Sequence, residues 1–185
     1  MSYREVFPME ILQGVSESNS YILMISSPTT GKEIPILIGD YEAQAIIMAQ
    51  EEISARRPMT HELFGAMFEA FGLTLKKVTI DKFEEGIFFA TLFLSDGFNE
   101  KRIDSRTSDS IVLALLNSCP IMMEDKVIQE AGVEPNALFS NSPQQRKQQD
   151  ETIEDLEKKL KQYEEAEEYE KAAEIQKIID QKNGV

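Results

Sequence analysis

Apolar residues follow two different periods along the first 133 residues, and each period marks one kind of element. Short apolar or alternating runs bounded by Gly, Pro, Ser and Asn are typical of strands. Seven stretches have this pattern: 5–15, 21–26, 34–38, 73–80, 87–94, 98–103 and 120–123. Recurrence every three or four positions predicts a helix instead. Four stretches have that spacing: 41–53, 60–71, 103–118 and 124–131.

The order of these elements predicts an α+β domain. The first three strands are joined by short turns, which favours an antiparallel meander. Pro35 has no N–H group to donate, so we expect either a sheet edge or the start of the third strand there. Asp96-Gly97 is a strong hairpin signal between two later strands. Strands, two helices, strands and a helix together predict an antiparallel or mixed sheet with helices packed on it.

One apolar stripe runs along the predicted helix at 60–71. Its members recur at helical spacing: Leu63, Phe64, Met67, Phe68 and Phe71. An aromatic and methionine stripe of this kind belongs to a core far more often than to a cofactor site, so we expect it to be buried. Thr60 is the expected N-cap of this helix.

Composition changes after residue 133. Residues 134–149 are rich in Pro, Asn, Ser and Gln and predict a linker between a domain at 1–133 and a tail at 150–185. The tail has the apolar spacing of two short helices separated at Glu167-Glu168, which predicts a C-terminal helical hairpin. Because so short a hairpin buries little core alone, we expect it to pack on a second copy or on a protein partner, and we expect a homo-oligomer.

The chain is strongly acidic, with a formal net charge of −14. Residues 1–149 carry 13 basic and 21 acidic side chains, and residues 150–185 carry 6 and 12, so both parts share the charge. Such a field does not steer a protein to nucleic acid. One cysteine excludes an intramolecular disulfide, and one histidine excludes a histidine-rich metal site. With no apolar signal or membrane-length run, we expect a cytoplasmic protein without membrane association.

The stretch 103–110 combines the most chemistry. It joins a strand end to a helix that is apolar on nearly every face, and it holds Asp104, Arg106, Asp109 and four hydroxyl side chains. A helix start carries unpaired N–H groups and a positive dipole end, so it can hold an anion or a carboxylate. The alternative is structural: Ser105 or Thr107 caps the helix, and Arg106 pairs with an acid.

Three stretches together resemble the bifunctional nuclease domain family over about residues 5–132. They are IPILIGDYEAQAI at 34–46, RPMTHELF at 57–64 and IDSRTSDSIVLALLNSCPI at 103–121. Thr107 stands where the family commonly has proline, and Glu62 where aspartate is usual. A fourth stretch, LEKKLKQYEEAEEYEKAAEIQKII at 156–179, resembles the UVR motif, a helical hairpin for protein association. Gln176 replaces the arginine often found there.

The resemblance implies hydrolysis of phosphodiester bonds in DNA and RNA. Glu42, Asp104 and Asp109 would hold a divalent cation, Mg²⁺ or Mn²⁺, which polarises a phosphate and activates water. Arg57 and Arg106 would neutralise transition-state charge, and His61 would act as general acid or base. The association face of the hairpin would comprise Leu156, Leu160, Tyr163, Tyr169, Ala172 and Ala173.

Each assignment has a structural alternative. His61 would pair with Glu62 or a helix end, Arg57 with Glu42, and Asp104 and Asp109 would both serve Arg106. The corresponding function is a non-catalytic regulatory or anion-binding oligomeric module that recruits a partner through the hairpin.

The first prediction concerns the domain boundary. Residues 1–133 alone should unfold cooperatively with nearly the full-length melting temperature, because a solvated linker separates the two apolar faces. Thermal unfolding of both proteins followed by circular dichroism measures this. A large drop on truncation would mean that the two parts share a core.

Overall fold

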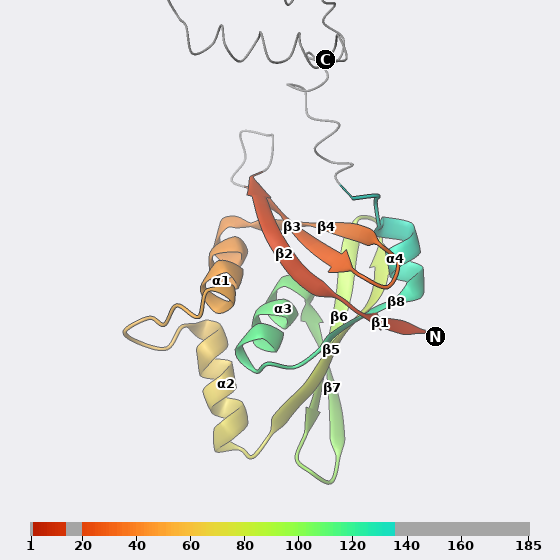
Figure 1. Cartoon of the computed structure of the whole chain (residues 1–185). Coiled ribbons are helices and arrows are strands. Elements are labelled where there is room, and N and C mark those ends of the chain that lie inside the picture. Colours follow the sequence, from red (N-terminus) through yellow and green to blue (C-terminus); the bar gives the residue numbers. More distant parts are fainter. Residues whose placement is uncertain (1, 14–19, 136–185) are drawn as a thin grey trace, which may run out of the picture. The chain divides into compact units, whose positions relative to one another are not determined.

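The computed structural model describes residues 2–13 and 20–135, which belong to one compact unit, Met1–Pro135 (Figure 1). The strands are β1 (Tyr3–Glu5), β2 (Phe7–Gln13), β3 (Ser20–Ser27), β4 (Lys32–Gly39), β5 (Thr74–Glu84), β6 (Ile87–Ser95), β7 (Glu100–Arg106) and β8 (Ile121–Glu124). The helices are α1 (Asp40–Gln50), α2 (Thr60–Ala70), α3 (Thr107–Leu116) and α4 (Asp125–Ala131). The predicted hairpin at 150–185 lies outside the described residues, and so does all but the start of the linker. None of the described helices is long and apolar enough to cross a membrane.

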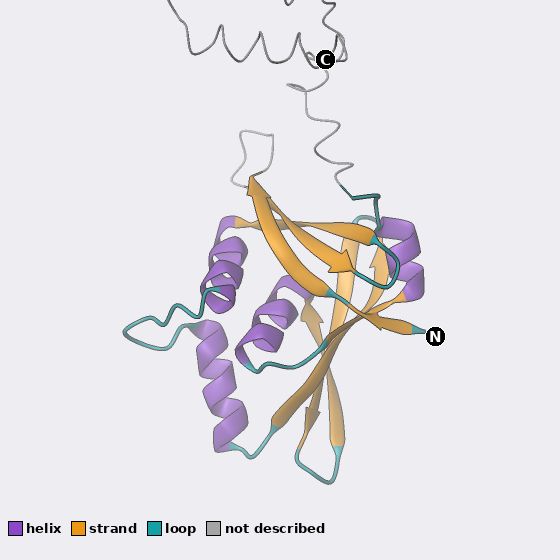
Figure 2. Ribbon diagram, in the orientation of Figure 1, coloured by secondary structure: helices purple, strands orange, loops and turns teal. Residues whose placement is uncertain are grey.

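The strands form two sheets (Figure 2). β2, β3 and β4 make the predicted antiparallel meander in that order, and β4 is an edge strand, as Pro35 indicates. The second sheet has the order β1-β8-β5-β6-β7, with β5 and β8 parallel and its other pairs antiparallel. The α+β class with a mixed sheet is therefore confirmed. β1 is too short for its pattern to have predicted it.

Helix α3 lies at the centre of the fold. It packs against β5, β6 and β7 of the larger sheet and against α1 and α2 (Figure 1). Four consecutive residues, Ile111–Ala114, are each at most 4% exposed. A helix that is apolar on every face must be covered on every face, so the run IVLALL places α3 in the core.

The expected burial of the α2 stripe is wrong for most of its members. Phe68 is 8% exposed, but Leu63, Phe64, Met67 and Phe71 are 53%, 45%, 44% and 73% exposed. Among the described elements α2 packs against α3 and β5, and only Phe68 is buried there. The periodicity was sufficient to predict one apolar face, but the fold covers only part of it.

The ends of three predicted helices also differ from the structure. The helix expected at 103–118 is α3, Thr107–Leu116, so residues 103–106 belong to β7 instead. α1 ends at Gln50, and Ile53, predicted on its apolar face, is 53% exposed beyond it. α2 has Met59 as its N-cap instead of Thr60, and the Met59 N–H donates to the Glu62 carboxylate at 2.7 Å. The Glu62 side chain thus satisfies the backbone N–H of the N-cap residue itself, whereas a Thr60 hydroxyl would have accepted from an N–H of the first turn.

The burial of the α2 stripe generates the second prediction. Phe68→Ala should lower the free energy of unfolding by about 3–5 kcal/mol, because it leaves a cavity in the core. Phe71→Ala should change it by about 0.5 kcal/mol or less, since this ring is mostly in solvent. Urea denaturation of both variants gives the comparison, and similar losses would contradict the observed exposure of Phe71.

Candidate functional site

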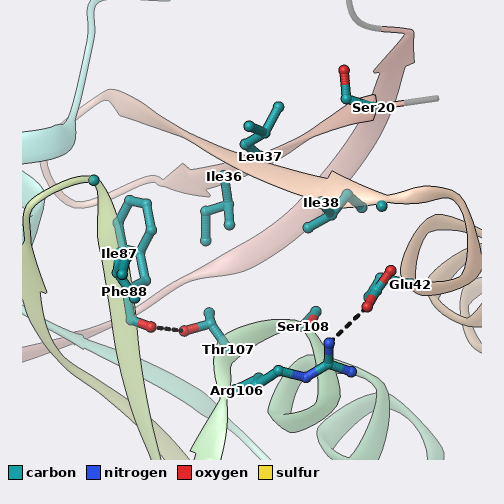
Figure 3. A pocket seen from close by; sticks show the side chains of 12 residues that line it. Ser20, Ile36, Leu37, Ile38, Glu42, Ile87, Phe88, Arg106, Thr107 and Ser108 are labelled. Carbon is teal, nitrogen blue, oxygen red and sulfur yellow. Dashed lines mark hydrogen bonds and ion pairs between the residues drawn. The ribbon is translucent and has the colours of Figure 1, made fainter. Parts of the chain in front are cut away.

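No loop separates β7 from α3: the strand ends at one residue and the helix begins at the next. Arg106 is the last residue of β7, paired with Phe89 of β6, and it is also the N-cap of α3. The next residue, Thr107, is buried, and its hydroxyl donates to the Phe88 carbonyl at 3.1 Å (Figure 3). This hydrogen bond holds the start of α3 against β6. The capping expectation is also corrected: the N-cap of α3 is Arg106 and not Ser105 or Thr107, and no side-chain capping hydrogen bond is made to this helix start among the described residues.

Arg106 lies at the centre of a cluster of four side chains. Its Nε and Nη2 donate to the two carboxylate oxygens of Asp109 at 2.7 and 3.0 Å, and its Nη1 donates to Glu42 at 2.7 Å. These bonds use three of the five N–H groups that a guanidinium carries. The side chain is 66% exposed, so its two remaining N–H groups can reach a ligand. The hydrogen bonds to Asp109 and Glu42 also raise the pKa of Arg106, so it stays charged.

Asp109 links Arg106 to the histidine. Its carboxylate lies 3.0 Å from His61 Nε2. Burial alone would raise the pKa of Asp109, but the hydrogen bonds from Arg106 and His61 outweigh burial and hold this pKa below its usual value. An ionised carboxylate only accepts hydrogen bonds, so His61 Nε2 carries the hydrogen. In the neutral ring, Nδ1 is then left as a base.

Glu42 reaches Arg106 because Gly39, the residue against which the Glu42 carboxylate folds, has no side chain. A Cβ atom built on Gly39 would lie 2.6 Å from Glu42 Oε2. The Gly39 backbone is extended, with φ −86° and ψ 176°, so alanine would fit its dihedral angles but not this space. Gly39 thus gives the Glu42 carboxylate room to fold back at the start of α1. The sequence analysis did not identify Gly39 as a site residue, although its place between a strand and a helix was visible.

The cluster is assembled from the first turns of three helices. Glu42 lies in the first turn of α1, His61 in that of α2 and Asp109 in that of α3. The positive end of a helix dipole favours a carboxylate at such positions. The expected involvement of Glu42, His61, Arg106 and Asp109 therefore corresponds to one connected group in space.

Two predicted site residues that the structure describes make no hydrogen bond or ion pair with this group. Asp104 pairs with Thr91 in the β6–β7 ladder, and its carboxylate makes no hydrogen bond or ion pair with any described residue. Arg57 is exposed on the loop between α1 and α2, likewise without an ion pair in the described part of the chain. The structural alternatives that paired Arg57 with Glu42 and Asp104 with Arg106 are wrong. So is the pairing of His61 with Glu62.

Two surface hollows flank Arg106. The β4–β6 hollow, about 470 Å³, is lined by Ile36 and Ile38 of β4, Ile87 and Phe88 of β6, and Glu42 and Arg106 at one end (Figure 3). The α2–β7 hollow, about 430 Å³, lies between α2, α3 and β7 and includes His61 and Asp109. Arg106 lines both, so a ligand bound to its outer N–H groups has room on either side.

The acids were also expected to hold a divalent cation, and the arrangement tests this. Glu42 and Asp109 direct their oxygens to the guanidinium of Arg106, and Asp104 lies apart from them. Among the described residues no group of three or more acids, histidines or cysteines is arranged to hold a metal ion. As they stand, these side chains do not fit a divalent cation, because a guanidinium already satisfies their charge.

The space that Gly39 leaves for the Glu42 carboxylate generates the third prediction. Gly39→Ala should displace the Glu42 carboxylate and weaken its bond to Arg106. In a double-mutant cycle with Glu42→Ala, the two changes should show a coupling energy of about 0.5–1 kcal/mol, the range of partly exposed ion pairs.

The matched control is Gly65→Ala, where the added Cβ meets no atom within 4 Å. It should show no coupling to Glu42→Ala in the same urea denaturation experiments. Equal coupling for both glycines would mean that Gly39 does not act through Glu42.

The bifunctional nuclease domain model matches residues 23–136, a range that contains all four helices described above. The uncharacterized proteins MT1877 and Rv1829 of Mycobacterium tuberculosis are each 34% identical over 115 residues, which are 62% of this chain and 68% of each relative. Neither name states an activity. On the family match, the chain belongs to the bifunctional nuclease domain family.

Proposed function

We propose that the protein is a nuclease that hydrolyses phosphodiester bonds in DNA or RNA, with Arg106, Asp109 and His61 as its working group. The observation that carries the proposal is the hydrogen-bonded chain from Arg106 through Asp109 to His61, located at the surface between two hollows. Family membership supports the substrate class, since the family is named for nuclease activity.

The proposed chemistry uses the two ends of this hydrogen-bonded series, Arg106 and His61. The outer N–H groups of Arg106 bind two phosphate oxygens, a geometry that suits a guanidinium. His61, held by Asp109 through Nε2, takes a proton from water at Nδ1 as the water oxygen bonds to phosphorus. The P–O bond to the leaving group then breaks, and the leaving oxygen takes a proton from solvent. Arg106 stabilises the charge that develops on the phosphate oxygens.

No step of this mechanism passes through a metal ion, because the donor set as arranged does not fit one. Dependence on Mg²⁺ or Mn²⁺ stays a prediction, and cleavage with and without a chelator tests it. The hairpin's role in self-association or partner binding also stays a proposal, drawn from the resemblance of residues 156–179 to the UVR motif.

A second candidate is a non-catalytic regulatory module in which these ion pairs are structural, and the charge balance of the cluster favours it over catalysis on a polyanion. One guanidinium faces two carboxylates, so with a neutral imidazole the cluster carries one excess negative charge. Such a group does not attract a polyanion by its net charge, and the chain as a whole is at −14. Under this reading the ion pairs fix the junction of the helices and serve no reaction.

The fourth prediction separates the two candidates. Asp109→Asn keeps the shape of the side chain but removes the charge that holds His61 and Arg106, so cleavage should fall by about 10²–10³. The assay is initial-rate cleavage of single-stranded DNA and RNA. Rates should be measured with and without Mg²⁺ or Mn²⁺.

A matched control exists on another helix. Asp125 also lies in the first turn of its helix, α4, and pairs with an arginine, Arg4. Asp125→Asn should therefore perturb the fold in a similar way and leave cleavage unchanged. If the parent protein cuts neither substrate under any of these conditions, the nuclease proposal fails and the non-catalytic regulatory module remains.

A further inference from the structure

The α2–β7 hollow has an apolar floor and an aromatic wall. Phe68, Leu92 and Leu113 lie at its base, each at most 8% exposed. Phe64 stands at its side with 45% of its surface exposed, and its ring is tilted 49° from that of Phe68 at 6.4 Å between centroids. The Phe64 ring therefore has accessible surface next to a volume of about 430 Å³. That volume falls within the range of about 300–1,000 Å³ usual for small-molecule sites.

One end of this hollow is the reactive cluster. His61, Arg106 and Asp109 all line it, so the apolar volume begins where the phosphate of the proposed function would bind. A group attached to that phosphate can enter the hollow from this end, and Asp104 is the one further charged side chain among the described residues that line the hollow. The ligand that fits has an anionic end and a flat or apolar end.

The opposite wall is the edge of a sheet. β7 is the last strand of the order β1-β8-β5-β6-β7, and its outer edge pairs with no other strand in the part of the chain that the structure describes. Three consecutive β7 residues, Ile103, Asp104 and Ser105, line the hollow. An unpaired strand edge presents backbone N–H and C=O groups, which a ligand with polar edges can satisfy.

We propose that the α2–β7 hollow is a nucleobase subsite: the base next to the phosphate on Arg106 stacks on Phe64 and directs its polar edge to the edge of β7. This inference rests on the proposed function, because it uses the phosphate position. A base combines a π-face with hydrogen-bonding edges, as the two walls require. A purely apolar ligand would leave the β7 edge unsatisfied, and a sugar has no flat π-face to stack on the Phe64 ring. Because backbone groups and one ring do the recognition, the subsite reads the presence of a base more than its identity.

The test compares ligands that differ only in the base. Binding of AMP, UMP and ribose 5-phosphate to the full-length protein is measured by isothermal titration calorimetry. The nucleotides should bind more tightly than ribose 5-phosphate. Phe64→Leu should weaken nucleotide binding by about 5- to 150-fold, the effect of losing one stacked base, and leave ribose 5-phosphate binding unchanged.

Two variants serve as controls. Phe64→Tyr keeps the ring and should keep nucleotide affinity, which shows that position 64 tolerates change. Phe71→Leu removes an exposed ring of the same helix that does not line the hollow, and it should have no effect. Thermal melts of all three variants establish that each is folded.

The outcomes separate this inference from the proposed function. Nucleotide binding that depends on the base and on Phe64, without cleavage, keeps the subsite and removes the nuclease. Cleavage without any preference for nucleotides over ribose 5-phosphate removes the subsite and keeps the nuclease. A change of molecular mass for Phe64→Leu in light scattering, with equal binding of all three ligands, would show instead that a second copy covers this face.

Discussion

The burial of α3 is the constraint on which the rest of the structure depends. Its residues Ile111–Ala114 are apolar on every side and cannot remain in water, so the larger sheet and two other helices cover them. At the N-terminal end Thr107 is buried and bonded to the Phe88 carbonyl, and at the C-terminal end Leu116 is 41% exposed. Because the helix axis is fixed along its length, the residues of its first turn are placed with the same precision. The polar cluster is thus held by the core beneath it.

Arg106 then acts as the common partner of two helix starts, because it binds Glu42 of α1 and Asp109 of α3. A guanidinium can bind two carboxylates at once because its donors point in different directions. The start of α2 joins this group through His61, which contacts Asp109. The arrangement keeps Asp109 ionised and orients His61. The two carboxylates also neutralise much of the positive charge of Arg106 that a phosphate would meet. The same contacts therefore support both a structural role and a catalytic role for these residues.

The cluster lies between two surface hollows and close to the edges of both sheets. It stands where the edge of β4, the start of β6 and the edge of β7 come near the helix starts, and hollows lie on both sides of it. A strand edge with unpaired backbone groups beside an apolar floor is costly to leave uncovered in a small domain. The exposed apolar face of α2 lies beside this strand edge. A ligand of the α2–β7 hollow would therefore supply both apolar area and hydrogen bonds.

The sequence by itself determined the α+β class, the meander, the hairpin turns and the burial of α3. These depend on local periods and turn residues, which act over a few positions. It also marked Asp109, Arg106, Glu42 and His61 as site residues, through the resemblance to a family. Tertiary structure alone decided which of them meet: Glu42 and Arg106 are 64 positions apart, and no local pattern encodes their contact. It likewise excluded Asp104 and Arg57 from the cluster and left most of the α2 stripe exposed, since burial depends on which neighbours the whole fold supplies.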